Sequence, residues 1–305
     1  MEEDANARKG TLLDELQNRI ADAAPKDGHI VPIPGLRLTR QSAPSMPIHG
    51  VSHPSVCLLA QGSKTILLGE DSFHYHRGNY LIITAELPII GQIVDAAEDR
   101  PFLGAVLELD PALIGSVMVE SGQVFLQNAA PVKAMAVNEL DEGLLDAVVR
   151  YVRLIESPKD ARVLVPLVKR EIVYRLLQGK QGPRLRQIAS LSGYSDGITM
   201  AIERLRGDFD KPLRMENIAD DLGMSLSSFY SRFKAVTAMS PLQYQKQLRL
   251  QEARRLLLNG DFDAASAGFK VGYDDASQFS REYKRFFGAP PMSDVKQFLR
   301  GEIAS

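Results

Sequence analysis

The feature that most constrains this chain is a small unit that occurs twice in its last hundred or so residues. In each copy, a short segment with apolar residues at helical spacing ends at a glycine, Gly223 in the first and Gly272 in the second. A capping residue follows, Ser225 in the first copy and Asp274 or Asp275 in the second, and begins another helical segment. Glycine suits the turn because a positive φ disfavours residues with side chains. The pattern predicts helix, tight turn, helix, twice, and hence an all-α C-terminal domain.

The second helix of each unit has the composition of a helix that enters a groove of DNA. Phe229 and Phe233 in the first copy align with Phe279 and Tyr283 in the second, so each pair lies on one helix face and anchors it. The opposite face carries small hydroxyl and basic side chains. Short side chains admit a helix to the major groove, and longer polar ones reach base edges and phosphates. The two units therefore indicate DNA binding.

A single helix is expected to join the two units. Pro241 suits a first helical turn, and Asn259 and Gly260 supply a stop. A helix of about 18 residues is about 27 Å long. Such a strut can set two recognition helices in successive major grooves, which lie about 34 Å apart along one face of the duplex.

These residues also resemble a known family. The segments GMSLSSFYSRFKAVTAMSPLQYQKQLRLQEARRLLL and FKVGYDDASQFSREYKRFFGAPP are similar to the AraC/XylS family of transcription regulators, over about residues 197–300. The resemblance implies a sequence-specific DNA-binding regulator, an activator rather than a repressor. It implies double-stranded promoter DNA and RNA polymerase as partners.

The resemblance assigns roles to single positions in the two recognition helices. Arg281 is expected to contact a guanine by bidentate bonding to O6 and N7, whereas Ala276 offers only apolar contact, as with a thymine methyl. The positions that resemble base readers are Ser227, Tyr230, Ser231, Ala276, Ser277, Ser280 and Arg281. The expected phosphate contacts are Arg232, Lys234, Lys246 and Lys284.

Two positions depart from the family pattern. Ala238 stands where the family usually has glycine, and Gly268 stands inside a helix where alanine is usual. Both departures are expected to matter little. Gly268 costs about 1 kcal/mol of helix propensity, which predicts a somewhat less rigid second unit.

The N-terminal part has the texture of a β-domain between helices. Short β-type runs are broken by turn residues, which favours an antiparallel sandwich or barrel over a parallel sheet. The expected strands are 36–40, 55–60, 64–68, 72–76, 80–84, 89–94 and 102–108. Helical spacing is found before them, in residues 10–24, and after them, from Glu139 to Leu177. Gly179 and Gly182-Pro183 then mark a domain boundary.

The expected organisation is an α+β chain of four parts. These are an N-terminal helix (1–28), a cupin-like antiparallel β-barrel (29–137), a helical connector (138–183) and the double helix-turn-helix domain (184–305). The barrel assignment rests on a second resemblance, of PSVCLLAQGSKTILLGEDSFHYHRGNYLIITAELPIIGQIVDA to the N-terminal domain of one AraC subgroup. Such domains bind a small-molecule effector or mediate dimerisation. The expected pocket residues are His74, His76, Glu86 and Gln92.

A metal-dependent cupin enzyme with a DNA-binding tail is the alternative from another class. His74-x-His76 has the spacing of a metal-binding pair, yet no glutamate follows closely and no histidine occurs after His76. His49 and His53 lie upstream in a proline-rich segment. Because a metal needs three or four placed ligands, we expect no metal, no cofactor and no enzyme activity. The favoured interpretation of the histidine pair is a polar strand face at the surface or mouth of the barrel. A third interpretation is a constitutive regulator whose barrel only dimerises.

Charge and cysteine content fit an intracellular regulator. Residues 184–305 hold 18 Lys and Arg against 15 Asp and Glu, net +3, whereas residues 1–183 hold 18 against 23, net −5. The single cysteine, Cys57, lies in an apolar run and is expected to be a buried hydrophobe. The acidic N-terminus lacks the apolar run of a signal peptide, and no membrane span is expected. These features predict a cytoplasmic protein, and they leave a homodimer open.

Overall fold

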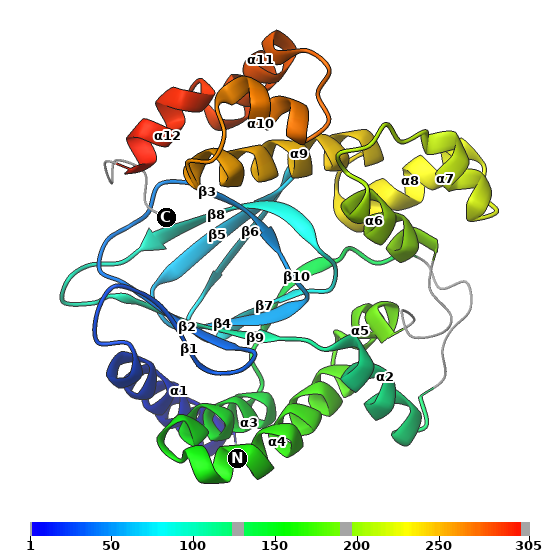
Figure 1. The fold of residues 1–305 in the computed structure, drawn as a ribbon. Coiled ribbons are helices and arrows are strands. Elements are labelled where there is room, and N and C mark those ends of the chain that lie inside the picture. Colours follow the sequence, from blue (N-terminus) through cyan, green and yellow to red (C-terminus); the bar gives the residue numbers. More distant parts are fainter. Residues whose placement is uncertain (1, 124–130, 190–196, 300–305) are drawn as a thin grey trace.

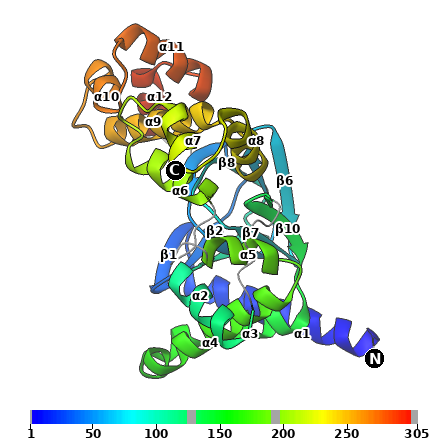
Figure 2. The same ribbon diagram turned by 90° about the vertical axis from the view of Figure 1, so that its right-hand side faces the viewer.

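The computed structural model describes residues 2–123, 131–189 and 197–299. Two β-sheets lie between helices α1 (Glu2–Ala23), α3 (Glu142–Arg153) and α4 (Pro158–Gln178) on one side and the C-terminal helices on the other (Figure 1). The view turned by 90° shows the same order of layers (Figure 2). The expected α+β class is confirmed.

Every pairing between described strands is antiparallel. One sheet has the order β1-β2-β9-β4-β7-β10 and the other the order β3-β8-β5-β6. The strands are β1 (Gly28–Ile33), β2 (Leu36–Gln41), β3 (Ile48–Ser52), β4 (Ser55–Gln61), β5 (Ser63–Leu68), β6 (Asp71–His76), β7 (Asn79–Ile83), β8 (Leu87–Asp95), β9 (Phe102–Glu108) and β10 (Met135–Glu139). Each strand expected from the sequence is present.

The sequence did not predict β1, β3 or β10. Pro32 interrupts β1, and proline removes a donor from the ladder. All five residues of β3 are half-buried, so the strand has no alternation of apolar and polar residues to mark it. The expected sandwich or barrel therefore gains three strands whose positions depend on tertiary contacts.

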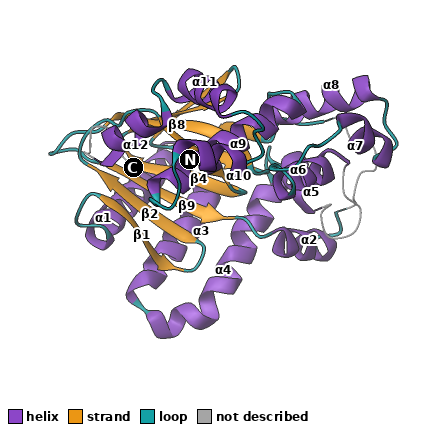
Figure 3. Cartoon of the chain, turned by 45° about the horizontal axis from the view of Figure 1, so that its top comes forward, coloured by secondary structure: helices purple, strands orange, loops and turns teal. Residues whose placement is uncertain are grey.

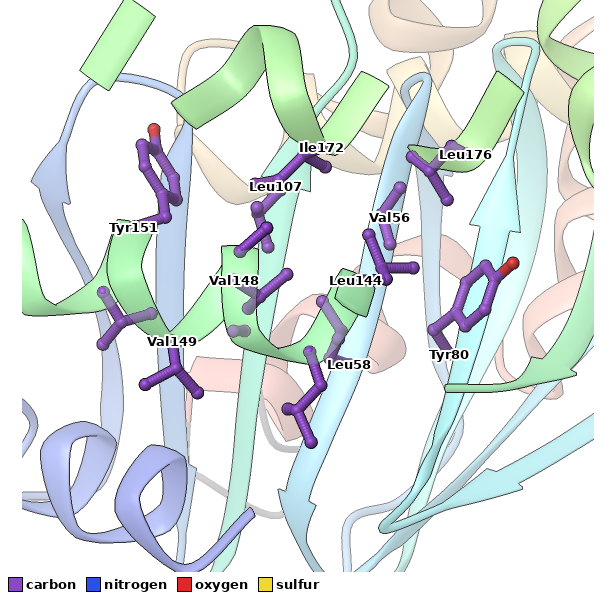
Figure 4. Close-up of a cluster of buried hydrophobic side chains, with 14 of the residues drawn as sticks. Val56, Leu58, Tyr80, Leu107, Leu144, Val148, Val149, Tyr151, Ile172 and Leu176 are labelled. Atoms are coloured by element: carbon purple, nitrogen blue, oxygen red, sulfur yellow. The ribbon is translucent and has the colours of Figure 1, made fainter. Parts of the chain in front are cut away.

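Strand alternation divides the six-stranded sheet into two faces. Val56 and Leu58 point to the helices, whereas Cys57 between them points to the other sheet. Figure 4 shows the helix side of this core, where sheet residues meet α3 and α4 through Leu144, Val148, Ile172 and Leu176. Burying a Leu or Val side chain contributes about 1.5–3 kcal/mol, so this cluster holds the helices on the sheet.

The remaining helices extend the N-terminal domain or build the C-terminal one. They are α2 (Pro111–Glu120), the 3₁₀ turn Leu154–Glu156, α5 (Gly182–Ala189), α6 (Gly197–Gly207), α7 (Met215–Asp221), α8 (Leu226–Thr237), α9 (Pro241–Leu258), α10 (Ala264–Lys270), α11 (Ala276–Phe287) and α12 (Pro291–Leu299). In the duplicated units, α7 with α8 and α10 with α11 are the two helix pairs, and α9 joins them.

The local signals of the duplicated units are confirmed. Gly223 and Gly272 have φ of 64° and 88°. The Ser225 hydroxyl accepts from the amide of Ser228, and the Asp275 carboxylate caps α11. Helix α9 begins with a capping box formed by Ser240 and Gln243, the third residue of the helix.

The two departures from the family pattern matter more than expected. Ala238 has φ of 59° and is the one non-glycine residue with positive φ among the described residues. That conformation costs about 1–2 kcal/mol for an L-residue. At Gly268, a Cβ atom would lie 2.9 Å from the ring of Phe279, so glycine lets α10 approach α11 closely. The lower rigidity of the second unit stays a prediction.

Candidate nucleic-acid interface and effector cavity

The first recognition helix, α8, is anchored by aromatic residues. Phe229 and Phe233 are fully buried, with ring centroids 5.7 Å apart. Ser227 and Ser231 on the other face are exposed, and Tyr230 is half-buried with its ring edge-on to Phe229. The helix therefore presents short hydroxyl side chains and one phenol to its surroundings.

The second recognition helix, α11, repeats this arrangement with a longer charged side chain. Phe279 and Tyr283 are buried, with centroids 5.5 Å apart. Ser277 and Arg281 are exposed, and Ala276 and Ser280 are half-buried (all four from the expected base-reading set). In the described part of the chain Arg281 makes no hydrogen bond or ion pair with another residue, so its guanidinium is available to a ligand.

The expected phosphate contacts fall into two kinds. Lys234 and Lys284 are exposed, and Arg232 is half-buried. Lys246 on α9 instead donates to the Glu282 carboxylate at 3.1 Å, which also accepts from the Tyr273 hydroxyl. Lys246 thus ties α9 to α11, a structural role that sequence reasoning did not identify.

Helix α9 also holds the second unit through Arg249. Its guanidinium donates to the carbonyl oxygens of Phe209 at 2.6 Å, Lys211 at 2.9 Å and Gly272 at 2.7 Å. Residues 209–211 precede the first unit, whereas Gly272 is the turn of the second. One side chain therefore fixes both units to the strut, and no local sequence signal identifies it.

The C-terminal domain is docked on the four-stranded sheet, with α9 packed on β8 and β3. Figure 3 brings the C-terminal helices toward the viewer. The Tyr244 hydroxyl donates to the carbonyl oxygen of Glu86 at 2.8 Å. The Glu86 carboxylate forms an ion pair with Arg206 of α6 and lies 3.1 Å from His53 Nδ1. Glu86, expected in the effector pocket, instead joins the two domains.

Strand β3 contacts the second unit through His49. Its ring lies 4.8 Å, centroid to centroid, from each of Phe286 and Phe287 at the end of α11. Its Nδ1 is buried without a hydrogen-bond partner among the described residues. The imidazole is therefore held as a neutral aromatic ring between two domains.

Lowering the pH should weaken this contact. Burial lowers the pKa of His49 to about 4, the Arg254 charge adds to the effect, and Asp294 opposes it. A histidine released into water has a pKa of about 6.5. The separated form therefore binds more protons between these values, so the docked form loses stability as pH falls through this range. Going from pH about 8 to pH about 5.5 should favour separation about tenfold.

Energy transfer between dyes on the exposed residues Glu98 and Met292 can follow this separation. His49→Phe keeps an aromatic ring but cannot take up a proton, so its signal should not change over the same pH range. An equal pH response in both proteins would contradict the role of His49.

A cavity of about 470 Å³ lies between the two sheets. Its wall includes Arg37 and Thr39 of β2, Cys57 of β4, Lys64 of β5 and Tyr75 of β6. Burial raises the pKa of the Cys57 thiol, as expected for a buried hydrophobe rather than a reactive group. Strand β3 borders both the cavity and the C-terminal domain, because Ile48, Gly50 and Ser52 line the cavity while His49 contacts α11.

None of the four expected pocket residues lines this cavity. His74 and His76 do share one strand face, as expected, but it is the exposed outer face, and Tyr75 between them points inward. His74 pairs with the Thr65 hydroxyl, and His76 with the Arg77 carbonyl. Gln92 is exposed. The apolar residues that alternate with the histidines fixed the orientation of β6, and this signal was readable in the sequence.

The described residues contain no group of three or more His, Cys, Asp or Glu side chains that could hold a metal ion. The His74 and His76 rings are 6.4 Å apart, centroid to centroid. None of the helices within the described ranges is long and apolar enough to cross a lipid bilayer.

Comparison with known proteins identifies the family. Residues 32–184, half of the chain, match the AraC-type transcriptional regulator N-terminus, and residues 218–297 match a helix-turn-helix domain. The chain belongs to the family of AraC-type transcriptional regulators.

Individual relatives agree with this assignment. The chain is 32% identical to the MmsAB operon regulatory protein of Pseudomonas aeruginosa over 40% of this chain and 39% of that protein. It is 28% identical to the transcriptional activator RhaS of Escherichia fergusonii over 54% of this chain and 58% of that protein. The chain thus spans well under two thirds of the length of these curated relatives.

A solved structure shows the same fold along most of the chain. Unsaturated fatty acid bound wild-type ToxT from Vibrio cholerae superposes with a TM-score of 0.53 at 10% identity, covering 88% of this chain and 97% of that one. At this identity the similarity concerns the fold alone.

Proposed function

We propose that the protein is a sequence-specific transcription regulator that binds double-stranded promoter DNA with α8 and α11. The observation that carries this function is the pair of recognition helices fixed to one strut. Each helix buries two aromatic residues and exposes its polar face, and Arg249 and Lys246 hold the second unit on α9. A rigid strut sets the spacing of two helices, which two adjacent major grooves require.

The two helices are proposed to read DNA differently. Arg281 is the one cationic side chain among the proposed base readers and can donate to two acceptors at once, so the second unit supplies guanine recognition. The first unit offers two serines and Tyr230, which discriminate less between bases. The exposed Lys234 and Lys284 contact phosphates and contribute sequence-independent affinity.

The cavity between the sheets is proposed to bind a small-molecule effector. Its volume of about 470 Å³ lies in the range of small-ligand sites. The ToxT structure with a bound fatty acid supports a ligand-binding role for this fold. Because β3 lines the cavity and contacts α11, a ligand that moves β3 would shift the balance between docked and released DNA-binding units.

The wider assignments rest on the family. We propose an activator that contacts RNA polymerase in the cytoplasm, and the similarity to RhaS, a transcriptional activator, supports the sign of regulation. Helix α4 exposes Val163, Leu164 and Leu167, which supports a homodimer. A constitutive regulator would show no stabilisation by any small molecule.

A mobility-shift assay on the gene's own promoter region tests the DNA-binding function. Arg281→Ala should weaken specific binding about 10- to 100-fold, because one bidentate guanine contact contributes about 1–3 kcal/mol. Arg255→Ala, which removes an exposed arginine of α9 paired with Glu252, is the control and should bind normally. Unchanged binding by Arg281→Ala would remove its reading role, and no specific binding to any genomic fragment would refute the function.

A further inference from the structure

Two cations face the cavity from opposite sheets. Lys64 of β5 in the four-stranded sheet is half-buried, and Arg37 of β2 in the six-stranded sheet lines the same cavity while remaining exposed. Neither forms an ion pair or hydrogen bond with any described residue of the chain. Burial lowers the pKa of Lys64; the Cys57 group opposes this effect and the Arg37 charge adds to it. The cavity wall therefore contains a half-buried amino group that has no hydrogen-bond or ion-pair partner among the described residues.

The fold makes room for Lys64 at this position. Gly91 of β8 lies beside it, and a Cβ atom at Gly91 would be 3.3 Å from Lys64 Cε and 3.3 Å from Ile66 Cδ1. Glycine at 91 thus leaves a path for the lysine stem into the cavity. Burial disfavours the charged form of an amino group that has no partner, and a nearby anion favours it, so a side chain held in this way is suited to an anionic ligand.

The other ionisable groups of the wall do not supply a negative charge that would neutralise Lys64 or Arg37. His53 is paired with Glu86 of the domain contact, and His29 is exposed. The one carboxylate of the wall, Glu108, is exposed at the end of β9 and forms no ion pair with Lys64 or Arg37. The wall also includes five apolar side chains, those of Ile66, Leu81, Ile83, Ile89 and Val106.

We propose that the cavity binds a small organic carboxylate, whose charged group meets Lys64 and Arg37 and whose apolar body packs on the residues between the sheets. Thr39 lines the same wall and offers a hydroxyl donor, whereas the Ser55 hydroxyl already donates to the carbonyl oxygen of His53 at 2.9 Å. The apolar side chains of the wall favour a carboxylate with a hydrocarbon body over inorganic phosphate. This proposal rests on the proposed effector-binding role of the cavity and names the class of that effector.

Thermal unfolding and titration calorimetry of the full chain test the proposal with four probes, octanoate and benzoate and their neutral counterparts octanamide and benzamide. The carboxylates should raise the unfolding temperature, and the amides should not. Lys64→Met should weaken carboxylate binding at least tenfold, since a charge-assisted contact is lost. Lys64→Arg should retain most of the affinity. Lys133→Met, which removes an exposed lysine outside the cavity, should bind normally.

The free protein gives a second readout. Lys64→Met should unfold at a higher temperature than the wild type when no ligand is present, because a half-buried amino group without a partner is replaced by an apolar side chain. Equal stabilisation by amides, unchanged binding by Lys64→Met, or no binding of either carboxylate would overturn the proposal. The mobility-shift assay needs no ligand, so a failure here with DNA binding intact leaves the regulatory function standing.

Discussion

Replacing Asp294 by alanine should destabilise the second helix-turn-helix unit by about 3–5 kcal/mol. Asp294 is buried, with 1% of its side chain exposed, and it accepts from Arg254 Nε at 2.8 Å and Nη2 at 3.0 Å. It also accepts from the Tyr283 hydroxyl at 2.7 Å. The alanine variant leaves a buried guanidinium and a buried phenol without their partner, and removing one member of a buried pair costs the desolvation of the other.

Urea unfolding followed by far-ultraviolet circular dichroism measures this effect. Glu252→Ala removes one partner of an exposed pair with Arg255 and should cost at most about 1 kcal/mol. Arg254→Met combined with Asp294→Leu should recover much of the loss, because no unpaired charge remains. The expectation fails if Asp294→Ala costs no more than Glu252→Ala. Since Tyr283 anchors α11, the single variant should also lose the DNA contacts of the second unit.

The helix-turn-helix units could be predicted because their signals are local. Each rests on a turn glycine, a capping side chain and aromatic residues four apart, and all of these act within one or two turns of helix. The strands with clear alternation were found for the same reason. Strand β3 was missed because its residues are half-buried throughout and its partner on one side is another domain.

The contact between the two domains depends on residues that lie far apart in the sequence. Glu86 lies 120 positions from Arg206 and 158 from Tyr244, its partners across the domain contact. Strand alternation correctly placed His74 and His76 on one face, and Phe73 and Tyr75, which alternate with them, indicate that the opposite face is the buried one. Lys64 was not recognised because a lysine in a strand is usually solvated, and only the opposite sheet makes it a cavity residue.

Alanine in place of the second turn glycine should be far more damaging than in place of the first. Gly223 and Gly272 occupy equivalent turns, and both have positive φ. A Cβ atom at Gly223 would have no heavy atom within 4 Å. Gly223→Ala should therefore cost only the left-handed conformation, about 1–2 kcal/mol. A Cβ atom at Gly272 would lie 2.0 Å from the carbonyl oxygen of Asp210. Displacing that backbone adds about 1–3 kcal/mol, for a total of about 2–5 kcal/mol.

The two variants also distinguish a loss of folding stability from a change in the relative placement of the two helix-turn-helix units. Asp210 belongs to the segment before the first unit, so its contact with Gly272 fixes the second unit relative to the first, together with Arg249. Gly272→Ala should weaken binding to a complete operator more than binding to a fragment that carries only the first half-site. Gly223→Ala should not show this difference. Equal losses of stability in the two variants, or equal weakening on both DNA fragments by Gly272→Ala, would show that the Asp210 contact does not set the spacing of the two recognition helices.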